Sequence, residues 1–270
     1  MELISSRSNP KIKQARALWQ RKARQSTRLF LVEGIRHVGE AVESGVSLEG
    51  IYYAPELLDS PFARNLVEEQ SRLGVPCYAT TTEVFASLAD KDNPQGILAV
   101  AHQFDRCLDE LTAGNFRWGV ALVAPQDPGN LGAILRTIDA VGASGLLLLD
   151  SSVDLYHPGT VRASMGTIFW IPVVNASFAE FSGWARCQGY HVYGTSAHGD
   201  VDYRQVEMYQ PPRILLMGSE RQGLTPDQAS VCDQMIRLPM RGRATSLNLA
   251  IATGVMLYAM LGEESNPLHT

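Results

Sequence analysis

Hydrophobic residues recur along this chain in two alternating patterns. Short apolar runs predict buried strands, and apolar residues three or four positions apart predict helices with one face in a core. In the first hundred residues, the predicted strands are 29–32, 50–53, 75–78 and 96–101. The predicted helices are 35–44, 61–73 and a short one capped by Thr81 or Thr82. This alternation is typical of a small α/β domain.

The second half of the chain repeats the alternation. Its predicted strands are 119–124, 146–149, 168–174, 190–195, 214–217 and 235–238. We expect a helix capped by Asn130 and ended by Gly142, a helix over 178–188, and a closing helix over 247–261 with Ser246 as its N-cap. Strands and helices that alternate this regularly predict a mostly parallel sheet with helices on both faces.

The two halves are predicted to be separate domains. Residues 105–116 are polar and lack periodicity, which indicates a linker. The sequence therefore predicts a small α/β domain at 1–104 and a larger α/β domain at 117–270.

Composition narrows the class of protein. With 270 residues and 45% hydrophobic composition, the chain can bury a sizeable core. No segment is long and apolar enough for a membrane span, and the first residues lack the apolar stretch of a secretory signal, which favours the cytoplasm. Four scattered cysteines form no C-x-x-C pair, so we expect reduced thiols and no metal site.

Charge is distributed unevenly along the chain. The net charge is -5, but residues 1–28 carry eight Lys and Arg against one Glu, a local charge of +7. A helix that starts at Asn9-Pro10 would place most of these charges opposite its apolar residues. A basic leader on an acidic body indicates a localised contact with nucleic acid, although a solvated helix face explains the leader equally well.

Candidate chemistry concentrates in the last third, where two predicted strands run into loops rich in Gly and small polar residues. Ligands bind at the carboxyl ends of strands in open α/β sheets, and Gly218 and Gly242 allow close backbone approach. No dinucleotide, phosphate-loop or hydrolase-elbow motif is present. His157 is more typical of a structural loop histidine than of a proton acceptor, and Ser219 and Ser246 lack the partners of a nucleophile.

Three polar residues in these regions have two interpretations each. Arg136 projects away from the apolar stripe of its helix, so it either pairs with Asp139 on the surface or grips a phosphate. Glu220 either caps a helix or orients a ligand. Asn248 either caps the closing helix or binds a ligand.

These residues also form a recognisable set. Asp127-Pro-Gly-Asn-Leu-Gly-Ala-Ile-Leu-Arg136, Met217-Gly-Ser-Glu220, and Ile236-Arg-Leu-Pro-Met240 with Ser246-Leu-Asn248 resemble the three motifs of the SpoU branch of the SPOUT RNA ribose methyltransferases. Val161-Arg-Ala-Ser-Met-Gly166 and the segments 9–13 and 30–34 extend the resemblance over nearly the whole chain. Arg221, Arg241 and Arg243 add positive charges to the motif loops, and their role is left open.

The resemblance implies a homodimeric, S-adenosylmethionine-dependent RNA 2′-O-methyltransferase with a C-terminal trefoil knot and an N-terminal, ribosomal-protein-like RNA-binding domain. The residues it places around the reacting ribose are Asn130, Arg136, Glu220, Ser246 and Asn248. Those it places at the cofactor are Met217, Gly218, Ile236, Leu238, Met240 and Leu247. The RNA-binding candidates are Lys11, Lys13, Arg21, Lys22 and Arg162.

Two other classes of protein remain open. A non-enzymatic RNA-binding or ribosome-assembly protein could keep the pocket for structure alone. A small-molecule dehydrogenase is disfavoured by the missing glycine fingerprint. Neither the target, ribosomal or transfer RNA, nor the methylated nucleotide can be read from the sequence.

Overall fold

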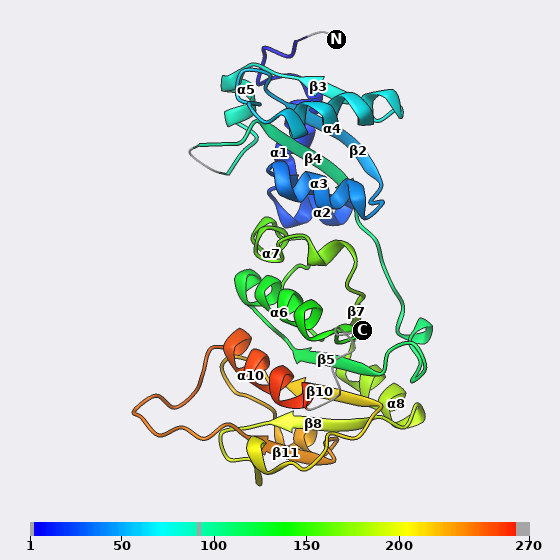
Figure 1. Ribbon diagram of the computed structural model, residues 1–270, viewed down its shortest axis with the longest axis vertical. Helices are drawn as coiled ribbons and strands as arrows, with labels where there is room; N and C mark the ends of the chain where they lie inside the picture. The colour runs from blue at the N-terminus through cyan, green and yellow to red at the C-terminus, as the bar shows by residue number, and fades with distance from the viewer. Residues whose placement is uncertain (1–2, 91–92, 263–270) are drawn as a thin grey trace, which may run out of the picture. The chain divides into compact units, whose positions relative to one another are not determined.

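The computed structural model describes residues 3–90 and 93–262, which form two compact units (Figure 1). The first unit comprises the chain up to Phe104 together with Asp154–Trp170, and the second comprises Asp105–Val153 and the chain from Ile171 onward. The segment Asp154–Trp170 is therefore flanked in sequence by the second unit but packs in the first.

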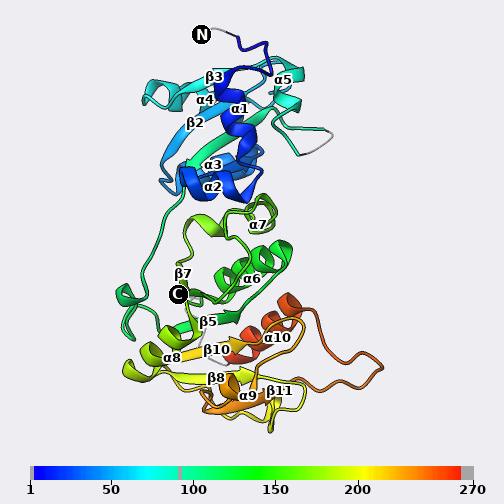
Figure 2. The same cartoon turned by 180° about the vertical axis from the view of Figure 1, so that it is seen from behind.

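The first unit is built on a four-stranded mixed sheet in the order β1-β4-β2-β3, of which β2 and β3 are labelled in Figure 2. β4 pairs antiparallel with β1 and β2, and β2 pairs parallel with β3. The strands are β1 (Leu29–Glu33), β2 (Leu48–Tyr53), β3 (Cys77–Ala79) and β4 (Ile97–His102). The helices are α1 (Pro10–Ala17), α2 (Arg21–Thr27), α3 (Ile35–Glu43), α4 (Pro61–Arg72) and α5 (Thr82–Ala86). The predicted strands and helices of this region are confirmed to within two residues.

The basic leader forms two helices, α1 and α2. Asn9 caps α1 by accepting the backbone N–H of Lys11 at 2.9 Å, and Ile12 and Ala15 are buried as the pattern predicts. Arg24 in α2 is only 1% exposed, so one of the eight positive charges of the leader is inside the protein.

Arg24 joins the leader to the segment Asp154–Trp170. Its Nε donates to Asp154 Oδ2 at 2.8 Å, and its Nη1 donates to the carbonyl oxygens of Leu18 at 2.7 Å and Trp19 at 3.0 Å. The segment continues through α7 (Pro158–Ala163). Because charges are costly to bury without partners, the bond to Asp154 ties this segment to the leader.

The strand predicted at 168–174 is wrong over its first five residues. A 3₁₀ turn, η2 (Thr167–Phe169), occupies that part, and β7 (Val173–Ala176) begins only afterwards. Gly166 adopts φ 103° immediately before the turn, and Pro172 has no N–H to donate to a sheet, so the chain becomes regular only beyond it.

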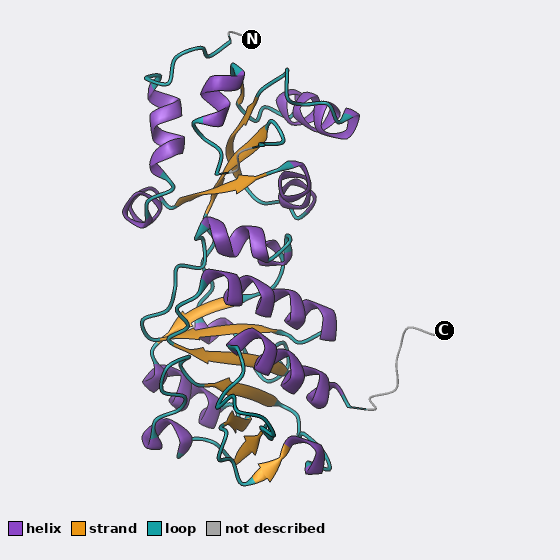
Figure 3. Ribbon diagram, turned by 90° about the vertical axis from the view of Figure 1, so that its left-hand side faces the viewer, coloured by secondary structure: helices purple, strands orange, loops and turns teal. Residues whose placement is uncertain are grey.

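The second unit contains a seven-stranded, fully parallel sheet in the order β7-β6-β5-β10-β8-β11-β9 (Figure 3). Its other strands are β5 (Trp118–Val123), β6 (Gly145–Leu149), β8 (His191–Thr195), β9 (Val201–Asp202), β10 (Arg213–Met217) and β11 (Gln234–Arg237). Its helices are α6 (Pro128–Val141), α8 (Phe178–Cys187), α9 (Pro226–Ala229) and α10 (Leu249–Leu261), with short 3₁₀ turns η1 (Leu108–Glu110) and η3 (Tyr203–Gln205). The predicted parallel α/β fold is confirmed, while the trefoil knot within that prediction stays a prediction.

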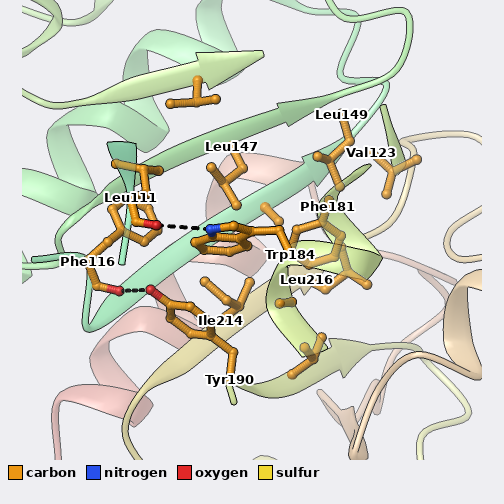
Figure 4. Packing of buried hydrophobic residues seen from close by; sticks show 14 residues of the cluster. Leu111, Phe116, Val123, Leu147, Leu149, Phe181, Trp184, Tyr190, Ile214 and Leu216 are labelled. Atoms are coloured by element: carbon orange, nitrogen blue, oxygen red, sulfur yellow. Dashed lines mark hydrogen bonds between the residues drawn. The ribbon is translucent and has the colours of Figure 1, made fainter. Parts of the chain in front are cut away.

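Both faces of the sheet are buried at β6. Successive residues of β6, such as Leu148 and Leu149, point to opposite faces, and both are 0% exposed. On one face, Trp184 of α8 packs into an aromatic and aliphatic cluster, where its Nε1 donates to Leu111 O at 3.0 Å (Figure 4). Phe116 lies in the same cluster, so the segment predicted as a linker supplies two buried side chains, Leu111 and Phe116, to this core.

None of the helices in the described part of the chain combines the length and the apolar character needed to cross a bilayer.

Candidate active site

A cavity of about 550 Å³ opens at the carboxyl ends of β8, β10 and β11, beside the first turns of α6 and α10. Thr195, Met217 and Leu238 line it from the strand ends, and Asn130 and Leu249 line it from the helices. Its size is typical of a pocket for a small ligand or cofactor. The cavity therefore lies where the strand-end rule predicts a ligand site.

The loop after β10 is closed on itself. Ser219 and Gly223 exchange backbone hydrogen bonds of 3.1 and 2.9 Å, which leaves Glu220 and Arg221 within a tight turn. A Cβ on Gly218 would lie 2.1 Å from the carbonyl carbon of Gly223, so only glycine lets the loop fold back here. The sequence therefore fixes the place of Glu220 through the two glycines that flank it.

The cap of α6 differs from the prediction. Asp127, not Asn130, is the N-cap, and its carboxylate accepts the N–H of Asn130 at 2.7 Å. Pro128 then occupies the first helical position, where its missing N–H costs nothing. With the cap supplied by Asp127, the side chain of Asn130 is left to face the cavity.

The cap of α10 also differs from the prediction. Asn248, not Ser246, is the N-cap, and its Oδ1 accepts the N–H groups of Ala250 at 2.9 Å and Ile251 at 3.3 Å. The helix therefore begins two residues later than expected, and Ser246 and Leu247 become part of the loop that lines the cavity.

The three motif regions meet in one row of hydrogen bonds at the cavity. Asn130 Nδ2 donates to Glu220 Oε1 at 2.7 Å, and Asn248 Nδ2 donates to Asn130 Oδ1 at 2.9 Å. The other oxygen of Glu220 accepts the N–H of Gln126 at 3.1 Å. An ionised carboxylate only accepts hydrogen bonds, so Glu220 fixes the orientation of both amides along the row.

Comparison with known proteins identifies this arrangement. The model of the SpoU rRNA methylase family matches residues 117–258, and the model of the MRM3-like substrate-binding domain matches residues 9–99. The chain belongs to the SpoU rRNA methylase family. Its predicted activity is confirmed: it is an enzyme that transfers a methyl group from S-adenosylmethionine to a ribose 2′-hydroxyl of RNA.

Several relatives of this SpoU methylase match over almost their whole length. It is 30% identical over 268 residues to the 23S rRNA (guanosine(2553)-2′-O)-methyltransferase of Bacillus subtilis, covering 97% of this chain and 100% of the relative. It is 34% identical to the 23S rRNA (uridine(2479)-2′-O)-methyltransferase of Streptomyces viridochromogenes, covering 94% and 90%. A crystal structure of an AdoMet-bound rRNA methyltransferase from Sinorhizobium meliloti superimposes with a TM-score of 0.88 at 36% identity, covering 96% and 97%.

The residues at the cavity fit the cofactor of a SpoU methylase. Met217, Gly218, Leu238, Met240 and Leu247 all line it, and their role in holding S-adenosylmethionine stays a prediction. Ile236 is not in the lining. It is fully buried in β11, where it can support the loop only from behind.

The predicted ribose-binding residues are not all together. Asn130, Glu220, Ser246 and Asn248 line the cavity, but Arg136 does not. Six residues of helix place Arg136 about 9 Å along α6 from Asn130 and about 240° around its axis. Arg136 is exposed, which confirms that it points away from the apolar stripe of α6.

The RNA-binding candidates lie in the first unit and are exposed. Lys11 Nζ donates to the hydroxyl of Tyr78 at 2.7 Å. Arg162 lies in α7 and forms an ion pair of 2.9 Å with Asp90, in which both side chains are about half exposed.

His157 serves as a cap. Its Nδ1 accepts the N–H of Gly159 at 3.0 Å at the start of α7, and burial, aided by the charge of Arg24, lowers its pKa below the ordinary value. The structural interpretation of this histidine is therefore the right one. In the two described stretches of chain, no three His, Cys, Asp or Glu side chains are grouped to hold a metal.

Sequence reasoning missed the wall at the end of β8. Thr195, Ser196, Ala197 and His198 line the cavity there. A signal was available, because the predicted strand 190–195 also runs into small polar residues. Cavity-lining residues therefore lie at the carboxyl end of this third strand as well as of the two strands named from the sequence.

Proposed function

We propose that this enzyme methylates a ribose 2′-hydroxyl of 23S ribosomal RNA and that it works as a homodimer. The observation that carries the proposal is the hydrogen-bonded row of Asn248, Asn130 and Glu220 beside a cavity of cofactor size. The choice of 23S RNA is supported by the names of the full-length relatives from Bacillus subtilis and Streptomyces viridochromogenes.

Two sets of residues would act at the cavity, one binding the cofactor and the other the RNA. Met217, Gly218, Leu238, Met240 and Leu247 would hold S-adenosylmethionine, mainly through backbone groups and apolar contacts, with Ile236 supporting them from behind. When bound, S-adenosylmethionine offers a methyl group on a positively charged sulfonium for in-line transfer to an oxygen nucleophile.

The row of polar residues would position the RNA. The side chains of Asn130, Glu220, Ser246 and Asn248 line one cavity and offer amide, carboxylate and hydroxyl groups to the ribose. Glu220 also holds both amides in a single orientation before RNA arrives. Such preorganisation lowers the barrier to an in-line displacement, because the hydroxyl must meet the methyl group along one direction.

Arg136 would act on the RNA backbone. A guanidinium stays protonated in proteins, so it cannot serve as the base that removes the hydroxyl proton. It can bind the phosphate next to the target ribose and stabilise negative charge that develops on the 2′-oxygen.

A homodimer would bring Arg136 to a cavity. α10 exposes Ile251 and Tyr258, each 58% exposed, together with Val255, and this apolar face is contiguous with Thr137 of α6. Exposed apolar faces are typical of protein contact sites, and a second copy is the simplest partner. Arg136 directly precedes Thr137 in α6, so one subunit could supply it to the cavity of the other.

The first unit would hold the rest of the RNA. Residues 1–104 would be the substrate-binding domain, 105–116 its connection, and 117–270 the catalytic domain. Lys11, Lys13, Arg21 and Lys22 are exposed cations suited to phosphates, and Arg162 could exchange Asp90 for one. The cytoplasm, where ribosomal RNA is found, would be the site of action.

The test is to incubate the protein with unmodified 23S rRNA and methyl-labelled S-adenosylmethionine and to map the product nucleotide by mass spectrometry. We expect one or a few 2′-O-methylated nucleotides. Arg136→Ala and Arg136→Lys should bind S-adenosylmethionine normally but lose methylation. Near wild-type turnover in both variants would remove Arg136 from the mechanism, and labelling of transfer RNA alone would overturn the choice of substrate.

A further inference from the structure

Three arginines lie in two of the loops that contribute residues to the cavity lining. Arg221 lines the cavity from the closed loop after β10. Arg241 and Arg243 lie in the loop between β11 and α10, which extends away from the sheet in Figure 1. All three are exposed, and residues 236–248 contain no Asp or Glu.

The loop that carries Arg241 and Arg243 contributes to the cavity lining on both sides of these arginines, and the backbone between them has no close neighbour. Met240 on one side and Thr245 on the other line the cavity. Between them, a Cβ added to Gly242 would meet no heavy atom within 4 Å. The two arginines are therefore attached to backbone that is next to cavity-lining residues and that has free space around Gly242.

Arg221 is held in a different way. It follows Glu220, whose carboxylate is anchored to Asn130 and Gln126, and the hydrogen bonds between Ser219 and Gly223 close the turn around it. Its backbone position is therefore fixed by bonds that need no ligand.

The chemistry of the substrate requires positive charge at this place. The 2′-carbon of a ribose is bonded to the 3′-carbon, which bears a phosphodiester, so a 2′-hydroxyl at the cavity brings a phosphate within a few bonds. Glu220, the one carboxylate among the described lining residues, would repel that phosphate. Guanidinium groups bind phosphate oxygens bidentately and would offset this repulsion.

We propose that Arg221, Arg241 and Arg243 form a phosphate-binding site for the RNA strand on either side of the target nucleotide. The assignment rests on the RNA substrate of the proposed function. It accounts for positive charge in the motif loops of a chain with a net charge of -5. It also gives the catalytic unit its own contacts to RNA phosphates, besides those of the basic leader in the first unit.

The experiment compares the wild type with Arg241→Gln/Arg243→Gln and with Arg221→Gln. RNA binding is measured by titrating fluorescent 23S rRNA transcript at several salt concentrations, and methylation is measured at varied RNA concentration. The control is Arg186→Gln, which matches Arg221→Gln in charge and removes an exposed arginine of α8 outside the cavity lining. Thermal unfolding checks that each variant is folded.

We expect the double variant to raise the KM for RNA roughly tenfold, with kcat within about twofold and S-adenosylmethionine affinity by calorimetry unchanged. Its slope of log affinity against log salt should become shallower by roughly 1.4, at about 0.7 per lost contact to single-stranded RNA. Arg221→Gln should change the logarithm of the KM for RNA and the salt slope by about half as much. Arg186→Gln should change neither.

Two results would overturn the site. One is an unchanged salt slope in the double variant, and the other is weaker binding of S-adenosylmethionine with RNA affinity intact, which would assign the arginines to the cofactor carboxylate. Failure of the proposed function is distinguishable, because wild-type protein would then leave 23S rRNA unmethylated while the binding titration still decides the role of the arginines.

Discussion

Two polar clusters hold distant parts of this chain together, and they differ in burial. In the first unit, Arg24 binds Asp154 and two carbonyl oxygens while 1% exposed. In the second unit, Asn248, Asn130 and Glu220 join three motif regions, with Glu220 and Asn248 exposed and Asn130 half-buried. Both clusters use charge-assisted hydrogen bonds across more than 80 positions of sequence.

Burial decides what each cluster can do. Charged groups inside the protein have no water to replace a lost partner, so the Arg24 cluster serves stability and has no access to a substrate. Glu220 and Asn248 of the row are exposed to solvent, so the bonds of the row contribute little to stability but its atoms can meet RNA. Three predictions test this division.

The largest effect is expected from Arg24→Ala. This change leaves the Asp154 carboxylate and two carbonyl oxygens without their donor, so the free energy of unfolding should fall by about 3–5 kcal/mol. Chemical denaturation measures it, with Lys22→Ala, an exposed neighbour in α2, as the control that should lose less than about 0.5 kcal/mol. A loss below about 1 kcal/mol for Arg24→Ala would mean that burial does not separate the two clusters.

Glu220→Gln should show the opposite profile. A glutamine amide can accept from Asn130 with its oxygen but then turns an N–H₂ toward the N–H of Gln126, where two donors face each other. We expect kcat to fall about a hundredfold, the scale of losing one preorganised group, while stability changes by less than about 1 kcal/mol. Single-turnover methylation measures the rate, and denaturation curves measure the stability. A kcat within twofold of wild type would mean that the row of Asn248, Asn130 and Glu220 has no part in catalysis.

The smallest effect is expected from His157, beside the Arg24 cluster. Burial first, and then Arg24, lower its pKa below 6.5, with Arg162 acting the same way and Asp154 and Asp90 opposing. The unfolded chain therefore binds the proton more readily, so stability is full above about pH 6.5 and declines as the pH falls below it. His157→Asn keeps a cap acceptor and should lose less stability between about pH 7.5 and 5.5 than wild type, as thermal melts would reveal. Equal losses in both proteins would assign the pH dependence elsewhere.

Much of the fold and part of the site could be predicted from local sequence. The alternation of apolar runs located most of the strands, because a buried strand in a parallel sheet is apolar throughout. Errors arose where two polar residues competed for one role. Asp127 and Asn130 could both cap α6, and Ser246 and Asn248 could both cap α10, and only the hydrogen bonds of the folded chain distinguish them.

What the sequence determined by itself was everything that depends on neighbouring residues: the strands, the helices, the turn glycines and the three motifs that carry the family. The tertiary structure alone decided that Asp154–Trp170 packs in the first unit, that Arg24 is buried, and that Asn130, Glu220 and Asn248 meet in one row of hydrogen bonds. The physical reason is that local pattern reports which side of an element is apolar, whereas the partner of a polar side chain is set by chain segments that meet only on folding.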